Sequence, residues 1–149
     1  TEASVMAPVR ADDWEIVVED VSEARALKGG DSFYGAKEGM KIILIKLKIT
    51  NLGKKVESAS DIWDFTLVTN LNKSYNSVYP ISLELILTPT EEVRAQATEY
   101  RGLETSASIA PGTYIEGSIL FQIPVNEYPE TLYFKVGVIG PTQVRVKLS

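Results

Sequence analysis

The alternation of apolar and polar residues predicts a chain built mainly of β-strands. The strongest such segment spans Met40–Asn51, where one face is uniformly apolar and is expected to lie in the core. The opposite face becomes polar from Lys46 onward, as expected where a sheet leaves its cover and meets solvent. The apolar face consists of Ile43, Ile45, Leu47 and Ile49.

Further segments carry the same two-residue period and are separated by turn residues. They are Trp14–Val21, Asp61–Thr69, Ser74–Tyr79, Ser82–Leu87 (weakly), Tyr114–Ile123, Thr131–Val138 and Thr142–Leu148. About seven or eight short strands with turns between them are typical of an all-β fold, and we predict an antiparallel, immunoglobulin-like β-sandwich. Trp14 and Trp63 each lead an apolar strand face, so both are predicted to be core residues.

One short helix is predicted as an insertion in this β scaffold. Thr88 is suited to the N-cap, Pro89 to the first helical position and Glu91 to the reciprocal capping bond. Helix-forming residues follow, so the helix is expected over about Pro89–Thr98, as the only helix longer than two turns.

The chain is expected to form a single domain over residues 1–149, because 149 residues with 44% apolar content suit one core. Residues 1–13 contain a proline and few large apolar side chains, which predicts a loose N-terminal tail. Two long segments without periodicity, Ser22–Gly39 and Ile86–Ser108, exceed ordinary connections, and such loops are often functional.

The composition excludes several classes of function. A net charge of -5 with no run of Lys and Arg argues against nucleic acid and anionic lipid as partners. The chain has no His and no Cys, which removes the usual zinc and copper ligands, the thiol nucleophile and the most common general base. We therefore predict no metal, no cofactor and no catalytic activity. No apolar stretch reaches the roughly 18 residues that a membrane span needs.

Four segments in order resemble a known family. They are Lys41–Asn51 (KIILIKLKITN), Phe65–Val68 (FTLV), Ile109–Gly112 (IAPG) and Gly117–Pro124 (GSILFQIP). Asn51 tolerates the left-handed backbone that ends a strand, Gly117 allows a bulge or a close approach, and Pro124 stops a strand ladder. The pattern resembles the uncharacterised immunoglobulin-like domains of bacterial and archaeal secreted proteins and lipoproteins, which are similar in fold to the mycobacterial immunoprotective extracellular antigens.

The resemblance implies an immunoglobulin-like fold and an extracytoplasmic location, secreted or membrane-anchored through a segment upstream of Thr1. It implies no catalytic residues. The leading hypothesis is therefore a non-catalytic binding or structural module. Its partner would be an unknown protein, a cell-envelope ligand or a second copy of the chain.

Two other functions remain open from the sequence. A proteinase inhibitor would present a rigid loop near Arg94 or Arg101, and a hydrolase would use a pair among the 20 acidic residues. Acidic residues near one another, such as Asp12, Asp13 and Glu15, or Asp61 and Asp64, match no calcium-loop spacing and are better explained as solvated acidic loops. We expect chelators to leave the melting temperature unchanged.

Aromatic residues in loops and at strand ends are candidates for recognition. Most of the tyrosines are interpreted as covering the ends of the core, and they are Tyr75, Tyr79, Tyr100, Tyr114, Tyr128 and Tyr133. Phe33 and Tyr34 lie among glycines and charged residues in the first long segment, and we predict that they form an interaction surface. Replacing both by Ser is then expected to weaken binding with little change in melting temperature.

Overall fold

Strand β6 (Met40–Asn51) has the bounds that its periodicity predicts and lies inside a four-stranded sheet. The computed structural model describes all of residues 1–149. β6 pairs antiparallel with β3 (Trp14–Ala24) on one side and with β13 (Tyr114–Pro124) on the other. β2 (Val9–Ala11) extends this sheet beyond β3, which gives the order β13-β6-β3-β2.

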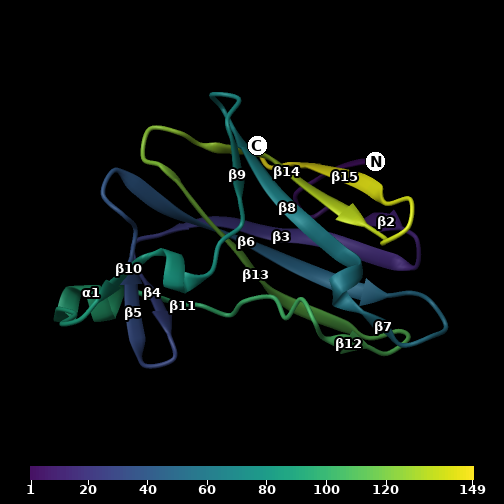
Figure 1. Cartoon of the computed structure of the whole chain (residues 1–149), viewed down its shortest axis with the longest axis horizontal. Coiled ribbons are helices and arrows are strands. Elements are labelled where there is room, and N and C mark those ends of the chain that lie inside the picture. Colours follow the sequence, from purple (N-terminus) through teal and green to yellow (C-terminus); the bar gives the residue numbers. More distant parts are fainter.

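A second sheet of five strands packs against the first (Figure 1), in the order β1-β15-β14-β8-β9. Its strands are β1 (Glu2–Ser4), β8 (Ile62–Thr69), β9 (Ser74–Asn76), β14 (Pro129–Val136) and β15 (Thr142–Lys147). The inward faces of both sheets form one apolar core that includes Trp14, Leu47, Phe121 and Phe134. The predicted all-β sandwich is therefore confirmed.

The two long non-periodic segments come together as a third, smaller sheet at one end of the molecule (Figure 1). The first segment supplies β4 (Leu27–Gly29) and β5 (Ser32–Gly35). β10 (Glu84–Ile86) ends at the first residue of the second segment. The second segment itself supplies α1 (Glu91–Gln96) and β11 (Thr98–Glu99). Leu27 and Leu83 pack there onto Ile42 and Leu44 of β6, so the small sheet covers the apolar half of the outer face of β6.

The remaining elements are short. β7 (Glu57–Ser58) pairs with β12 (Ser108–Ile109), and two 3-10 helices span Ala59–Asp61 and Pro80–Ser82. None of the helices has the length and apolar character that crossing a bilayer requires.

Helix α1 is shorter than the predicted Pro89–Thr98 and begins later. Its N-cap is Thr90, whose Oγ1 accepts a hydrogen bond from the backbone N of Val93 at 3.2 Å. Thr90, rather than the predicted Thr88, is therefore the N-cap. This start places two glutamates in the first turn, where the helix dipole favours negative charge. With six residues, α1 does not reach two turns, so that part of the prediction was wrong.

The predicted loose tail over residues 1–13 is also wrong. β1 pairs parallel with β15, and β2 pairs antiparallel with β3. Val9 and Ala11 are buried in the main core. Strands of three residues are too short for periodicity to reveal, and these two are specified by the sheet edges to which they bind.

Trp14 and Trp63 occupy opposite environments. Trp14 is 1% exposed in the core, as predicted, whereas Trp63 is 37% exposed. The prediction for Trp63 fails because Asp64 adopts a left-handed backbone with φ of 58°, and the register of β8 against β14 shifts at this point. This β-bulge reverses the alternation, so that Ile62 and Phe65 point into the core.

Asn51 ends β6 through its side chain rather than through a left-handed backbone. Its buried Nδ2 donates to the carbonyl oxygens of Lys55 and Ile109, at 2.7 and 2.8 Å, and its Oδ1 accepts from the backbone N of Gly53. These bonds tie the turn after β6 to the segment that precedes β13.

A buried carboxylate stabilises the turn between β13 and β14. Glu127 accepts hydrogen bonds from Thr69 Oγ1 at 2.6 Å and from the Tyr75 hydroxyl at 2.9 Å. The bond from Thr69 is the main cause that lowers the pKa of Glu127 below its ordinary value of 4.5, against the opposing effect of burial.

The lowered pKa of Glu127 predicts a loss of stability in acid. Its contribution to stability is complete above about pH 4.5 and is lost as the pH falls through the lower pKa of the folded state. Glu127→Gln keeps an acceptor but has no charge to lose, so its free energy of unfolding should depend less on pH below 4.5. Urea unfolding from pH 3 to 7 measures this dependence, and substitution of an exposed glutamate, Glu104→Gln, is the control. If the free energy of unfolding changes with pH equally in Glu127→Gln and in the parent protein, the prediction is wrong.

Candidate functional site

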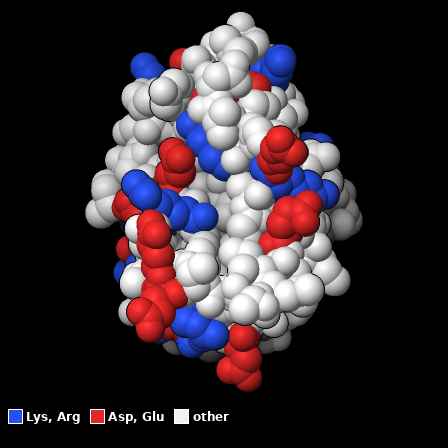
Figure 2. Space-filling view, turned by 90° about the vertical axis from the view of Figure 1, so that its left-hand side faces the viewer, with Lys and Arg blue, Asp and Glu red and all other residues white.

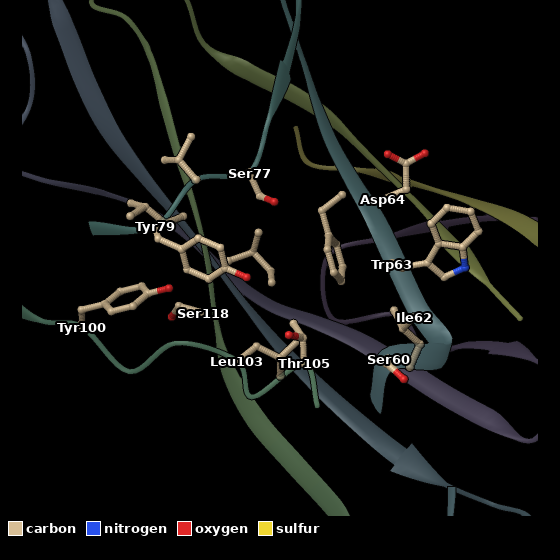
Figure 3. A pocket seen from close by; sticks show the side chains of 14 residues that line it. Ser60, Ile62, Trp63, Asp64, Ser77, Tyr79, Tyr100, Leu103, Thr105 and Ser118 are labelled. Carbon is tan, nitrogen blue, oxygen red and sulfur yellow. The ribbon is translucent and has the colours of Figure 1, made fainter. Parts of the chain in front are cut away.

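A pocket of about 310 Å³ lies at one side of the sandwich, between the edges of β8 and β13. Four segments that are far apart in the sequence form its walls. Its lining residues are Ser60, Ile62, Trp63, Asp64, Phe65, Ser77, Val78, Tyr79, Tyr100, Leu103, Thr105, Ser118, Ile119 and Leu120 (Figure 3).

The edge of β8 is open beside this pocket. β9 pairs with β8 over Thr66–Val68 only, and one further bond joins the backbone N of Ser77 to the carbonyl oxygen of Phe65 at 3.4 Å. Ile62–Asp64 therefore has β14 on one side and no strand on the other. Inward and outward side chains of β8 both line the pocket, which places the pocket at the edge of the strand.

The edge of β13 opposite is held by two short segments. The backbone N of Val78 donates to Leu120 at 2.8 Å, and the backbone of Ser118 bonds with Arg101 and Leu103 at 2.8 and 3.0 Å. The second contact depends on Gly117, because a Cβ there would lie 2.5 Å from Cα of Leu103. The close approach predicted for Gly117 is therefore made with the backbone of Leu103, and the segment around Leu103 borders the pocket.

The pocket has an apolar floor and a rim of hydroxyl groups. Ile62, Phe65, Leu103, Ile119 and Leu120 are buried and form the floor. In Figure 3, Tyr79 and Tyr100 lie on one side of the pocket and β8 on the other, with Ser77 above and Leu103 and Thr105 below. The hydroxyl-bearing residues are Ser60, Ser77, Tyr79, Tyr100, Thr105 and Ser118.

The electrostatics of the pocket favour uncharged ligands. Its one carboxylate, Asp64, pairs with Lys135 at 3.0 Å and points away from the tyrosines (Figure 3). Burial raises the pKa of the Tyr100 phenol, and the neighbouring Tyr79 raises it further, so Tyr100 stays neutral. An apolar floor with a few convergent polar groups is the usual composition of a ligand pocket, and 310 Å³ lies at the small end of the usual range of roughly 300–1,000 Å³.

Phe33 and Tyr34 lie in β5, at the small sheet rather than at the pocket, and they face opposite sides of that sheet. Phe33 is 6% exposed, and the charged groups of Arg94 and Lys28 lie 5.2 and 5.9 Å from its ring centre. Tyr34 packs against the cluster around Leu27. Their role in binding a partner stays a prediction, but the expectation of an unchanged melting temperature does not fit the burial of Phe33.

The structure changes the expected result of substitution at Phe33. Phe33→Ser should lower the free energy of unfolding by about 2 kcal/mol, because a buried aromatic ring is lost and a hydroxyl takes its place. Tyr34→Ser should cost less, since Tyr34 is only partly buried. Urea denaturation of the two single variants measures the difference, and equal costs would contradict this placement.

The acidic residues singled out in the sequence lie in separate contacts. Glu15 pairs with Arg10 at 3.0 Å, Asp61 accepts a hydrogen bond from Trp14 Nε1 at 2.8 Å, and Asp64 pairs with Lys135. Asp12 has a left-handed backbone in the turn before β3. The structure brings together no group of three or more acidic residues that could hold a metal ion.

Glu19 and Glu116 form a carboxyl pair that interacts directly. A shared hydrogen bond is the main cause that raises the pKa of Glu19 and lowers that of Glu116, and Lys46 lies 3.7 Å from Glu116. The pair lies on the outer face of the sheet, across β6, and neither residue lines the pocket between β8 and β13.

The two arginines considered for an inhibitor loop are both held by secondary structure. Arg94 lies in α1, and the backbone oxygen of Arg101 accepts a hydrogen bond from Ser118 of β13. Backbone groups of both residues are thus bonded within the domain.

The sequence pointed to some pocket residues but not to the pocket. Tyr79 and Tyr100 were among the tyrosines considered, whereas Tyr114 and Tyr128 lie elsewhere, beneath Lys48 and Lys41. The serines and Thr105 carry no periodic signal that could have singled them out.

The fold and the pocket define a β-sandwich domain with a small pocket at the seam between its sheets. The chain belongs to the family described as "Domain of unknown function (DUF4352)", whose model matches residues 4–144. An uncharacterised domain family was the expectation from the four sequence segments, and this part of it is confirmed. The chain matches no curated protein.

Solved structures of similar fold share little sequence with this chain. An uncharacterized β-sandwich protein from Clostridium difficile 630 is 16% identical with a TM-score of 0.56, over 98% of this chain and 92% of that one. A conserved hypothetical protein from Bacillus anthracis is 13% identical with a TM-score of 0.61, over 95% and 94%. The yjhA protein from Bacillus subtilis is 14% identical with a TM-score of 0.61, over 99% of both chains. At these identities the likeness shows the fold alone.

Proposed function

We propose that this domain is a non-catalytic, extracytoplasmic binding module whose site is the pocket between β8 and β13. The observation that carries the proposal is the composition of this pocket: a buried apolar floor, a rim of six hydroxyl-bearing residues and a single carboxylate that is already paired with Lys135. Such a site binds uncharged groups through apolar burial and orients them with hydrogen bonds.

A binding role fits the chemistry of the pocket better than catalysis does. A serine nucleophile needs an adjacent base, and the chain contains no His to supply the usual one. The hydroxyl of Ser60 is hydrogen-bonded to the hydroxyl of Ser58 at 2.8 Å, which is no base.

Substitution at Ser77 tests the pocket. Ser77 is exposed and lines the rim, so Ser77→Trp should fill the opening without disturbing the core; Ser106→Trp, in an exposed turn outside the pocket, is the matched control. Uncharged probes, namely capped amino-acid amides and methyl glycosides, should shift the amide NMR signals of Ser118–Leu120 in the parent protein and in Ser106→Trp but not in Ser77→Trp. Shifts that persist in Ser77→Trp, or no shift with any probe, would refute the proposal.

The extracytoplasmic part of the proposal is supported by the resemblance to domains of secreted proteins and lipoproteins. The open reading frame upstream of Thr1 tests it. A signal peptide, with or without a terminal lipid-modified cysteine, supports this location, and a start codon directly before Thr1 contradicts it.

A further inference from the structure

The free edge of β8 and the pocket beside it suit different parts of one ligand. β14 pairs with one side of Ile62–Asp64 and no strand pairs with the other. The N–H of Ile62 donates to the carbonyl oxygen of Ala59, so this edge offers a partner the remaining backbone groups. An extended peptide that adds to a sheet edge gains main-chain hydrogen bonds from the strand and specificity from a pocket that takes a side chain. A small solute would use the pocket and leave the strand edge unpaired.

The floor of the pocket specifies the side chain. Phe65, Leu103 and Ile119 are buried and apolar, so the group that enters must be large and apolar to displace the water. An acidic side chain would meet no free cation there, and the chain already carries a net charge of -5. A basic side chain would find the carboxylate of Asp64 already paired.

Apolar surface continues from the mouth of the pocket along the chain. Tyr79 is 67% exposed at the rim, and Ile81 is 87% exposed two residues later. Figure 2 looks onto the end that carries the small sheet, where charged residues of both signs lie among uncharged ones. Exposed apolar residues of this kind beside a pocket are typical of sites that bind proteins.

The bulge at Asp64 limits what can add to this edge. A left-handed residue interrupts the pairing register after Ile62 and Trp63, so the open edge is short. Bulges and short edges prevent a sheet from joining another sheet indefinitely, and they still permit one or two main-chain bonds.

We infer that the seam between β8 and β13 binds an extended segment of a partner protein, which adds to the edge of β8 at Ile62–Asp64 and inserts one large, uncharged apolar side chain into the pocket. This inference rests on the proposed function, because it assigns a ligand class to the same pocket.

Short blocked peptides test the inference directly. The probe is N-acetyl-Ser-Trp-Ser-amide, compared with the same peptide carrying Gly or Glu at the centre, and binding is followed by the amide NMR signals of Ile62–Asp64 and Ser118–Leu120. The Trp peptide should shift both sets, and the Gly and Glu peptides should bind at least about tenfold more weakly. Ser77→Trp should weaken binding of the Trp peptide to a similar extent, and Ser106→Trp should not.

Backbone methylation separates strand addition from simple filling of the pocket. Two further peptides carry an N-methyl group on the central or on the following residue, and only one of these two amides can face β8. One of them should bind about tenfold more weakly than the parent peptide, because it loses a main-chain hydrogen bond and gains a steric clash.

Equal binding of both methylated peptides would overturn the inference, and so would weaker binding of the Trp peptide than of methyl glucoside. In either case the proposed function survives, since the pocket still binds. If no probe shifts the pocket signals, the proposed function falls as well.

Discussion

Replacing Trp14 by Ala should lower the free energy of unfolding by about 3–5 kcal/mol, the largest effect expected for one core residue. Trp14 is 1% exposed, and its ring packs between the two sheets in the main core. Its Nε1 also donates to Asp61 Oδ2 at 2.8 Å, so the substitution removes a donor from a carboxylate next to the core. Urea denaturation followed by circular dichroism measures the change.

Trp63 provides the matched control. Trp63→Ala removes the same side chain from a position that is 37% exposed, where the indole N–H bonds to the carbonyl oxygen of Gly137 and Lys135 lies over the ring. We expect a smaller loss of about 2 kcal/mol, because less apolar area is withdrawn from water at Trp63 than at Trp14. Losses of similar size for the two tryptophans would contradict the β-bulge that separates their environments.

The second large effect is expected at Gly117, where Ala should cost about 3 kcal/mol. The new Cβ would lie 2.5 and 2.6 Å from the backbone Cα and N of Leu103, so the segment around Leu103 must move away from β13. This movement breaks the two hydrogen bonds between Ser118 and this segment and exposes Leu103. Denaturant unfolding measures the loss. The affinity for the Trp peptide should fall as well, because Leu103 lies in the floor of the pocket.

Gly35→Ala is the control for Gly117→Ala. A Cβ at Gly35 would meet Cδ1 of Ile86 at 3.5 Å, which is ordinary contact. Ala is also better suited than Gly to a strand, so the free energy of unfolding should change by less than about 0.5 kcal/mol. A Gly117→Ala variant as stable as Gly35→Ala would show that the 101–103 segment does not lie against β13.

The long strands were accessible from the sequence because their two-residue period extends over many positions. The outer face of β6 changes from apolar to polar residues for a structural reason. Ile42 and Leu44 lie under the small sheet, whereas Lys46 lies beyond it. Trp63 was assigned to the wrong side because one left-handed residue, Asp64, reverses the alternation. Asp tolerates this backbone without any change in composition that a sequence pattern could reveal.

The pocket and the small sheet could not be derived in this way. The pocket joins short pieces such as Ser60, Ser77 and Thr105, whose only common property is their position in the folded chain. In the small sheet, only β10 lies in a segment with a weak period, Ser82–Leu87. The other three strands have two to four residues each, too few for a period, and they pair across two insertions that are distant in sequence.

The parallel pairing of β1 with β15 has a consequence for how the chain reaches its native state. The amino group of Thr1 lies 3.4 Å from the carbonyl oxygen of Gln143, across a separation of 142 residues. β1 therefore has no partner until β15 has been synthesised, so the five-stranded sheet is completed only after all its other strands exist. Such nonlocal pairing makes folding slow, in the range of milliseconds to seconds for β-sandwiches.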